Sequence, residues 1–238
     1  MTPGYDFVDG DTDPADSSGH GTRVANLIAG DGANGVGFGG LCGRCRVMPV
    51  RALSGRPGST ADVAAGIAWA ADHGAQVINV SLSTPAASGL LRDAVDHAVN
   101  KGSLVVASAG NMEPTAWRYP AAYEPVLSVS AEVATKNTAT DRWVDVNAAG
   151  TWPVLGRNNV AAPTSGASGS TALVSGVAAL AFALKPDASA ADVRSSIQRT
   201  AKLSPVQPPY GTPTVNALGM CSTSVPPTPS RPRSPRPG

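Results

Sequence analysis

Hydrophobic and polar positions follow two different periods along this chain. Four short apolar runs have the length and composition of buried strands, at residues 47–53, 77–82, 104–108 and 126–130. Helical patterns separate or follow these runs, at residues 22–29, 90–100, 168–184 and 192–200. A further helix is predicted after Ser59, with Val63, Ile67, Trp69 and Ala70 facing the core. This alternation predicts a three-layer α/β fold: a doubly wound, mostly parallel sheet with helices on both faces.

Two helical segments carry more specific expectations. The segment 168–184 is apolar nearly all round, so we expect it inside the molecule. Ser17 or Ser18 is available to cap the helix 22–29. Parallel α/β sheets bind ligands at the carboxyl ends of their strands, so candidate chemistry is sought there.

Composition narrows the possible partners. A chain of 238 residues with 42% hydrophobic residues can bury one large core, so residues 1–220 are expected to form a single domain. Residues 221–238 are rich in Pro, Ser, Thr and Arg and predict a tail that does not fold. The net charge of +1 gives no electrostatic basis for binding nucleic acid or anionic membranes. No apolar run reaches the roughly 20 residues that a bilayer span requires. We expect a monomer, and residues 1–238 show no signal-peptide pattern.

The three cysteines predict one local disulfide. Cys42 and Cys45 form a C-x-x-C motif, and Cys221 stands alone, so the three cannot complete a four-ligand zinc site. A thioredoxin-like redox pair would open a helix, whereas a strand pattern follows Cys45. We therefore favour a disulfide between Cys42 and Cys45.

Three polar residues at element ends suggest nucleophilic chemistry. His20 lies between two glycines where a helix begins, Ser168 opens the buried helix, and Asn111 follows a strand. A Ser–His pair with an amide donor performs acyl transfer, because imidazole takes the hydroxyl proton while the amide stabilises the oxyanion. Taken singly, His20 is also compatible with a surface imidazole at a helix cap, and Gly110-Asn111 with a simple turn. An α/β-hydrolase is disfavoured, since its histidine follows the nucleophile and its elbow reads G-x-S-x-G.

Four sequence blocks, in order, resemble those of the subtilases, the subtilisin-like serine peptidases of family S8. They are a histidine block at 18–25, a substrate-binding strand at 78–83, an asparagine block at 107–111 and a nucleophile block at 166–176. The resemblance implies an extracellular serine endopeptidase acting on extended polypeptides, with His20 as general base, Ser168 as nucleophile and Asn111 as oxyanion donor. It also implies a groove lined by Ser81, Leu82, Ser83, Ala109 and Gly110. Ser165 is a rival nucleophile, but only Ser168 has the family's spacing to Gly176.

The chain departs from the family pattern in places. Ala167, Gly169, Ser170 and Ala172 replace family residues around the nucleophile, and Gly169 is expected to add flexibility there. Ser83-Thr84 stands where the family has Gly-Gly and is expected to narrow the specificity pocket.

No aspartate matches the family's third catalytic residue. That aspartate ends an apolar strand well before the histidine, whereas Asp6, Asp9, Asp11, Asp13 and Asp16 all lie close to His20 in a turn-rich stretch. We therefore expect a chain that begins after the aspartate strand, with activity reduced about 10⁴-fold.

No cofactor is expected. Calcium is the one metal that the acidic run 9–16 and the segment 34–37 suggest, although clustered aspartates in turns are more often solvated loops. Besides the peptidase, two interpretations stay open: a non-catalytic relative that binds peptides in the same groove, and an α/β scaffold with no site.

Overall fold

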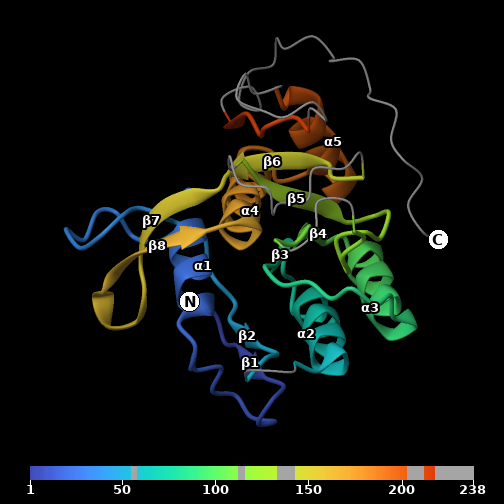
Figure 1. The fold of residues 1–238 in the computed structure, drawn as a ribbon, viewed down its shortest axis with the longest axis horizontal. Coiled ribbons are helices and arrows are strands. Elements are labelled where there is room, and N and C mark those ends of the chain that lie inside the picture. The colour runs from blue at the N-terminus through green and yellow to red at the C-terminus, as the bar shows by residue number, and fades with distance from the viewer. Residues whose placement is uncertain (55–57, 112–115, 133–142, 203–211, 218–238) are drawn as a thin grey trace.

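A computed structural model describes residues 1–54, 58–111, 116–132, 143–202 and 212–217. Its central sheet contains four parallel strands in the order β3 (Val77–Val80), β4 (Leu104–Ser108), β5 (Leu127–Glu132) and β6 (Val146–Ala149) (Figure 1). Helix α3 (Gly89–Asn100) connects β3 to β4, as parallel neighbours require. The predicted α/β class and its parallel sheet are confirmed.

The central sheet is covered on both faces. Every residue of β4 is buried, and its side chains alternate between two hydrophobic clusters. Val105 and Ala107 belong to one cluster, Leu104 and Val106 to the other. Such a continuous apolar run is what a strand between two helical layers needs, because successive side chains point to opposite faces.

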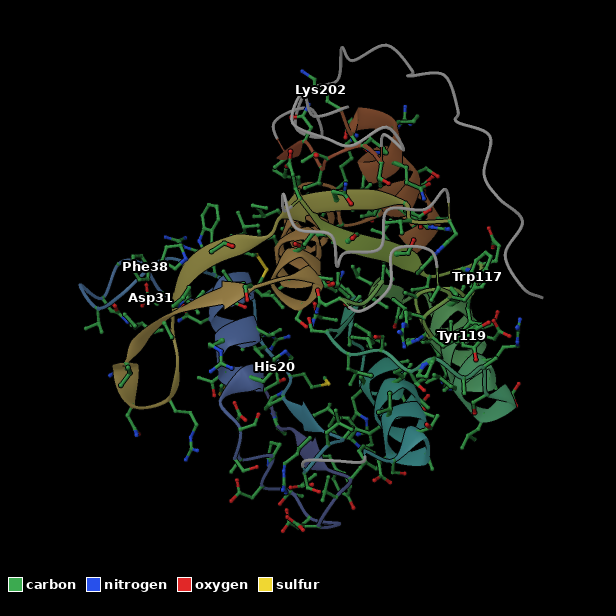
Figure 2. All side chains as sticks on the ribbon, viewed as in Figure 1. His20, Asp31, Phe38, Trp117, Tyr119 and Lys202 are labelled. Atoms are coloured by element: carbon green, nitrogen blue, oxygen red, sulfur yellow. A yellow bond between two sulfur atoms is a disulfide. The ribbon has the colours of Figure 1, made fainter. Side chains whose placement is uncertain are left out.

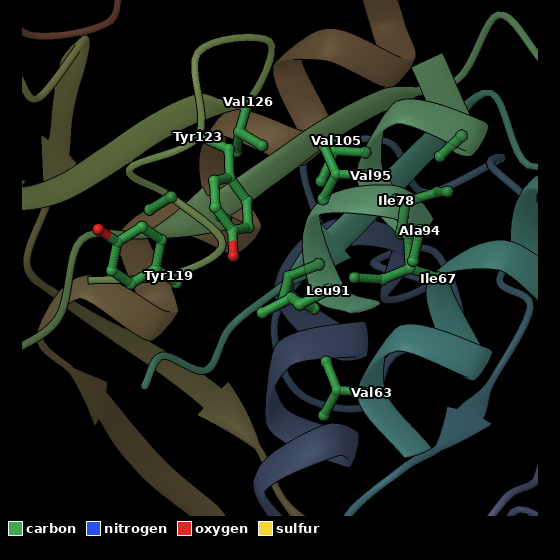
Figure 3. Close-up of a cluster of buried hydrophobic side chains, with 14 of the residues drawn as sticks. Val63, Ile67, Ile78, Leu91, Ala94, Val95, Val105, Tyr119, Tyr123 and Val126 are labelled. Atoms are coloured by element: carbon green, nitrogen blue, oxygen red, sulfur yellow. The ribbon is translucent and has the colours of Figure 1, made fainter. Parts of the chain in front are cut away.

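Helices α2 (Thr60–Asp72) and α3 cover the first face. They pack against each other, and Leu91 of α3 points toward Val63 and Ile67 of α2 (Figure 3). Ser59 caps α2 as predicted, its hydroxyl accepting a hydrogen bond from the Asp62 N–H at 3.2 Å.

Helices α1 (His20–Ala29), α4 (Ala167–Leu184) and α5 (Ala190–Thr200) cover the second face. Helix α4 contacts all four strands of the central sheet as well as α1 and α5, and twelve of its residues are buried. It is the one described helix whose length and composition would also suit a membrane span, and 67% of it is buried. Its placement as a core helix agrees with the prediction.

Two small sheets complete the described fold, and of their four strands only one falls within a predicted strand. Strand β1 (Tyr5–Asp6) pairs in parallel with β2 (Val50–Arg51), so the predicted strand 47–53 is shorter than expected. Strands β7 (Thr151–Leu155) and β8 (Ala161–Ser165) form an antiparallel hairpin whose tip holds a short 3₁₀ turn, η1 (Arg157–Asn159). Strand β7 contacts α1, and β8 leads directly into α4.

The structure joins Cys42 to Cys45 in the predicted disulfide. Cys221 and the predicted tail 221–238 lie outside the described residues. Beyond residue 202 the structure describes residues 212–217, and Thr214 exchanges two backbone hydrogen bonds with Lys202.

Neighbouring leucines of α3 provide a direct test of this core. Leu91 is 1% exposed and Leu90 is 55% exposed. Leu91→Ala should lower the free energy of unfolding by about 2–5 kcal/mol, because it removes buried methyl groups and leaves a cavity. Leu90→Ala, measured by the same urea denaturation, should change it by about 0.5 kcal/mol or less. Equal losses in the two variants would contradict the placement of α3.

Candidate active site

The start of α1 holds His20 at the surface (Figure 2). The sequence suggested Ser17 or Ser18 as the cap, but the N-cap residue is Gly19, with φ +78°. Ser18 still contributes, because its hydroxyl accepts a hydrogen bond from the His20 N–H at 3.1 Å. Asp16 also reaches the first turn, accepting hydrogen bonds from the Gly19 N–H at 2.8 Å and the Thr22 N–H at 2.7 Å. A carboxylate suits this place, because free N–H groups and the helix dipole both favour negative charge. His20 is thereby fixed at its element boundary.

The electrostatic surroundings favour a neutral imidazole at His20. Partial desolvation and the positive charge of Arg23 lower the pKa of His20 from its usual 6.5, while the Asp16 carboxylate opposes the shift. A neutral imidazole can accept a proton, so His20 has the protonation state that a general base requires.

The first turn of α4 is held by Asn111, which follows β4. The Asn111 Oδ1 accepts a hydrogen bond from the Ala167 N–H at 2.8 Å. Because Oδ1 is the acceptor, the amide orientation is determined and Nδ2 is the group left to donate. Ser168 is the second residue of α4, so its N–H has no acceptor within the helix. The structure thus brings two hydrogen-bond donors to the start of α4.

Gly166 makes the approach of Asn111 possible. Its φ is +77°, and a Cβ atom there would lie 2.5 Å from Asn111 Oδ1. Any other L-residue would both strain the backbone and collide with the asparagine. Gly166 therefore determines where the amide lies.

Ser168 and Ser81 exchange two hydrogen bonds. The Ser168 hydroxyl donates to the Ser81 carbonyl at 3.1 Å, and the Ser81 hydroxyl donates to the Ser168 carbonyl at 2.9 Å. Behind them, the Asn79 amide donates to Ser81 Oγ at 3.0 Å and accepts from the Ser175 hydroxyl at 2.9 Å. The end of β3 is thereby connected to two turns of α4.

The predicted groove residues follow β3 and β4. Ser81 is buried, Leu82 half-buried and Ser83 exposed, while Ala109 and Gly110 are buried just before Asn111. Gly110 has φ +90°, a conformation that favours glycine. The residues Ser81, Ser168 and Asn111 thus gather at the carboxyl ends of β3 and β4.

His20 is not hydrogen-bonded to Ser168 in this conformation. Helices α1 and α4 pack together, but the Ser168 hydroxyl is directed to Ser81. Over the described ranges, the His20 ring makes no hydrogen bond to any side chain, carboxylates included. Asp16, whose charge acts on His20, has both oxygens engaged in the first turn of α1.

The other acidic residues near the amino terminus have structural roles. Burial opposes ionisation of Asp6, but Arg51 and the N–H groups of Val8 and Asp9 outweigh it and lower the pKa of Asp6. Arg51 also pairs with Asp9. Within the described residues, no group of three or more His, Cys, Asp or Glu side chains is arranged to hold a metal ion.

Gly169 has a packing role that the sequence comparison did not suggest. A Cβ atom there would lie 2.9 Å from Thr164 Cγ2 of β8 and 3.6 Å from Leu27 Cδ1 of α1. The missing side chain therefore lets three elements meet beside Ser168, and Gly169 is fully packed rather than loose.

The sequence pattern did not single out Asn79, Ser175 or Gly166 as site residues. Asn79 and Ser175 are polar residues inside otherwise apolar elements, which is the signal that would have drawn attention to them. The contact of Gly166 with Asn111 joins residues far apart in the chain and leaves no local signal.

Ser81, Asn111 and Ser168 gather at the start of a helix on a parallel α/β sheet, and comparison with known proteins assigns the family. The sequence model of the subtilase family matches residues 1–223, so the chain belongs to the subtilases. The family resemblance noted in the sequence is confirmed.

Individual relatives agree with this assignment. A thermophilic serine proteinase of Bacillus sp. (strain AK1) is 40% identical over 83% of this chain, and thermitase of Thermoactinomyces vulgaris is 38% identical over 83%. This chain covers 50% of the former and 72% of the latter. The crystal structure of a cold-adapted subtilisin-like serine proteinase superposes with a TM-score of 0.81 at 28% identity, over 90% of this chain and 79% of that one.

The protonation state of His20 can be measured without any enzyme assay. In an NMR titration the imidazole of His20 should have its midpoint below pH 6.5, since desolvation and Arg23 disfavour the charged form. Arg23→Gln should raise the pKa of His20, and Arg23→Lys, which keeps the charge, should change it little. His20→Gln identifies the resonance among the three histidines. A midpoint at or above 6.5 in the unmodified chain would contradict the described surroundings.

Two glycines with a similar positive φ test the placement of Asn111. Gly166 has φ +77° and contacts Asn111, whereas Gly74 has φ +78° and a Cβ there would meet nothing within 4 Å. Both Ala variants place an L-residue at positive φ and are strained there, but only Gly166→Ala displaces the amide. Ser168 of the Gly166→Ala variant should react with a fluorophosphonate about 10²–10³-fold more slowly than Ser168 of the unmodified chain. This range is the loss seen when one oxyanion donor is removed from a subtilisin. Equal rates in the two variants would show that Asn111 does not act on the reaction at Ser168.

Proposed function

We propose that this chain is a serine endopeptidase that hydrolyses peptide bonds, with Ser168 as nucleophile, His20 as general base and Asn111 with the Ser168 N–H as oxyanion donors. The hydrogen bond from Ala167 to Asn111 is the observation that carries the proposal, because it leaves the Asn111 Nδ2 to donate beside the nucleophile. Membership of the subtilase family supports the same roles.

The substrate is proposed to be a polypeptide in extended conformation. Residues 81–83 leave β3 at its carboxyl end beside Ser168, and Ser83 is exposed. An extended chain can pair with such a segment through main-chain hydrogen bonds. We further propose an extracellular location, which the Cys42–Cys45 disulfide supports because disulfides persist in oxidising compartments.

A peptide-binding relative without catalysis is the second candidate. Two observations favour it: the Ser168 hydroxyl donates to Ser81, and among the residues described no carboxylate bonds to the His20 ring. Without an orienting carboxylate, imidazole loses control of its tautomer and a partner for its positive charge, which costs about 10⁴ in kcat. We therefore propose that residues 1–238 alone hydrolyse a standard peptide about 10⁴-fold more slowly than thermitase.

Labelling by a fluorophosphonate, located by mass spectrometry, distinguishes the two candidates. The peptidase proposal expects the label on Ser168, with Ser168→Ala abolishing both labelling and peptide hydrolysis. Ser165→Ala is the matched control, since Ser165 is exposed in β8 three residues earlier and should leave both unchanged.

Two results would decide against the peptidase proposal. The first is a label on Ser165, and the second is peptide binding with no labelling even after long exposure. Turnover equal to that of thermitase would refute the proposed impairment alone.

A further inference from the structure

The side chain of Arg118 lies against the predicted groove. A Cβ atom added to Gly110 would be 3.1 Å from Arg118 Cγ and 3.3 Å from Ser83 Oγ. Gly110 directly precedes Asn111, and Ser83 lies two residues after Ser81. Arg118 therefore meets both groove segments next to the proposed oxyanion donor.

The backbone around Arg118 is held firmly. Tyr119 and Thr84 exchange two backbone hydrogen bonds of 2.9 Å, which fix the segment beside the chain that follows β3. Trp117 and Tyr119 anchor it on either side, with ring centroids 5.4 Å from Trp143 and 4.9 Å from Tyr123 (Figure 2). A residue between two packed aromatics keeps its position, as specificity requires.

The charge of Arg118 is not neutralised by an ion pair within the described residues. The residue is half-buried, and no described carboxylate lies within 4.0 Å of its guanidinium. By contrast, Arg51 and Arg194 both pair with buried aspartates. A guanidinium is a planar donor suited to bind a carboxylate through two hydrogen bonds.

We propose that Arg118 selects substrates with an aspartate or glutamate at the residue whose carbonyl is attacked. Asn111 would hold that carbonyl oxygen, and the side chain of the same residue would then lie beside Gly110, whose neighbours are Ser83 and Arg118. This inference rests on the proposed function and names its substrate class. Ser83 in place of glycine then does more than narrow the pocket, because its hydroxyl adds a donor for the same carboxylate.

Binding to the Ser168→Ala chain tests the inference apart from catalysis. Two fluorescent peptides that are identical except for Glu or Gln at the selected position differ in charge but hardly in shape. The Glu peptide should bind roughly 10- to 100-fold more tightly, as expected for charge-assisted hydrogen bonds. Arg118→Gln should remove the difference, and Arg118→Glu should reverse the preference toward a Lys peptide.

Arg92→Gln is the matched control. Arg92 is also half-buried, and its Cζ lies 4.6 Å from the centroid of the Tyr123 ring. The Arg92→Gln variant therefore removes one positive charge from outside the proposed pocket. It should leave the Glu preference intact. Circular dichroism confirms that each variant is folded.

Each outcome separates this inference from the proposed function. Equal affinities for the Glu and Gln peptides, a preference that survives Arg118→Gln, or no binding of either peptide would overturn the role of Arg118. An Arg118-dependent Glu preference in a chain whose Ser168 never reacts with a fluorophosphonate would instead overturn the peptidase proposal and leave the acidic specificity standing.

Discussion

Three hydrogen bonds at the first turn of α4 determine where the candidate site lies. Asn111 accepts from the Ala167 N–H, and Ser168 and Ser81 exchange hydroxyl–carbonyl bonds, so the helix start is tied to the ends of β3 and β4. Twelve of the 18 residues of α4 are buried, and the helix packs against the sheet, α1 and α5, which holds its position. Small residues make this closeness possible: Gly166 admits the Asn111 amide and Gly169 admits Thr164 and Leu27. A nucleophile held by both core packing and polar contacts has the fixed geometry that catalysis requires.

His20 belongs to a less complete part of the same arrangement. Its helix is set by Asp16, whose carboxylate satisfies the first-turn N–H groups and is therefore not free to orient the imidazole. Partial desolvation and the positive charge of Arg23 lower the pKa of His20. Under the proposed roles, the site combines two placed oxyanion donors with a base to which, over the described residues, no carboxylate is hydrogen-bonded. Arg23 lowers the pKa of His20, whereas the side chain of Arg118 lies beside Gly110 in the predicted groove.

Much of the fold follows from local pattern. Strand β4 and helices α2 to α5 lie within about two residues of the predicted ranges, because burial on both faces or on one stripe leaves a period that is visible in the sequence. Strands β7 and β8 were missed because they leave little apolar pattern: six of their ten residues are exposed, and the other four are partly or fully buried. Each strand also contains a proline, which argues against a strand in the sequence. His20, Asn111 and Ser168 could be selected from their element boundaries. The contacts that position them could not, because Ala167 and Asn111 are 56 residues apart and Ser81 and Ser168 are 87 apart. Arg118 gave no sequence signal, as only the fold brings it to Gly110.

A crystal structure of the chain with a peptide boronic acid ending in an aspartate analogue tests the central claim most directly. The account predicts a covalent bond from Ser168 Oγ to boron, with one boronate oxygen within hydrogen-bond distance of both the Asn111 Nδ2 and the Ser168 N–H, and the acidic side chain against Arg118. A boronate bound to Ser165, or one whose oxygen points away from Asn111, would contradict it.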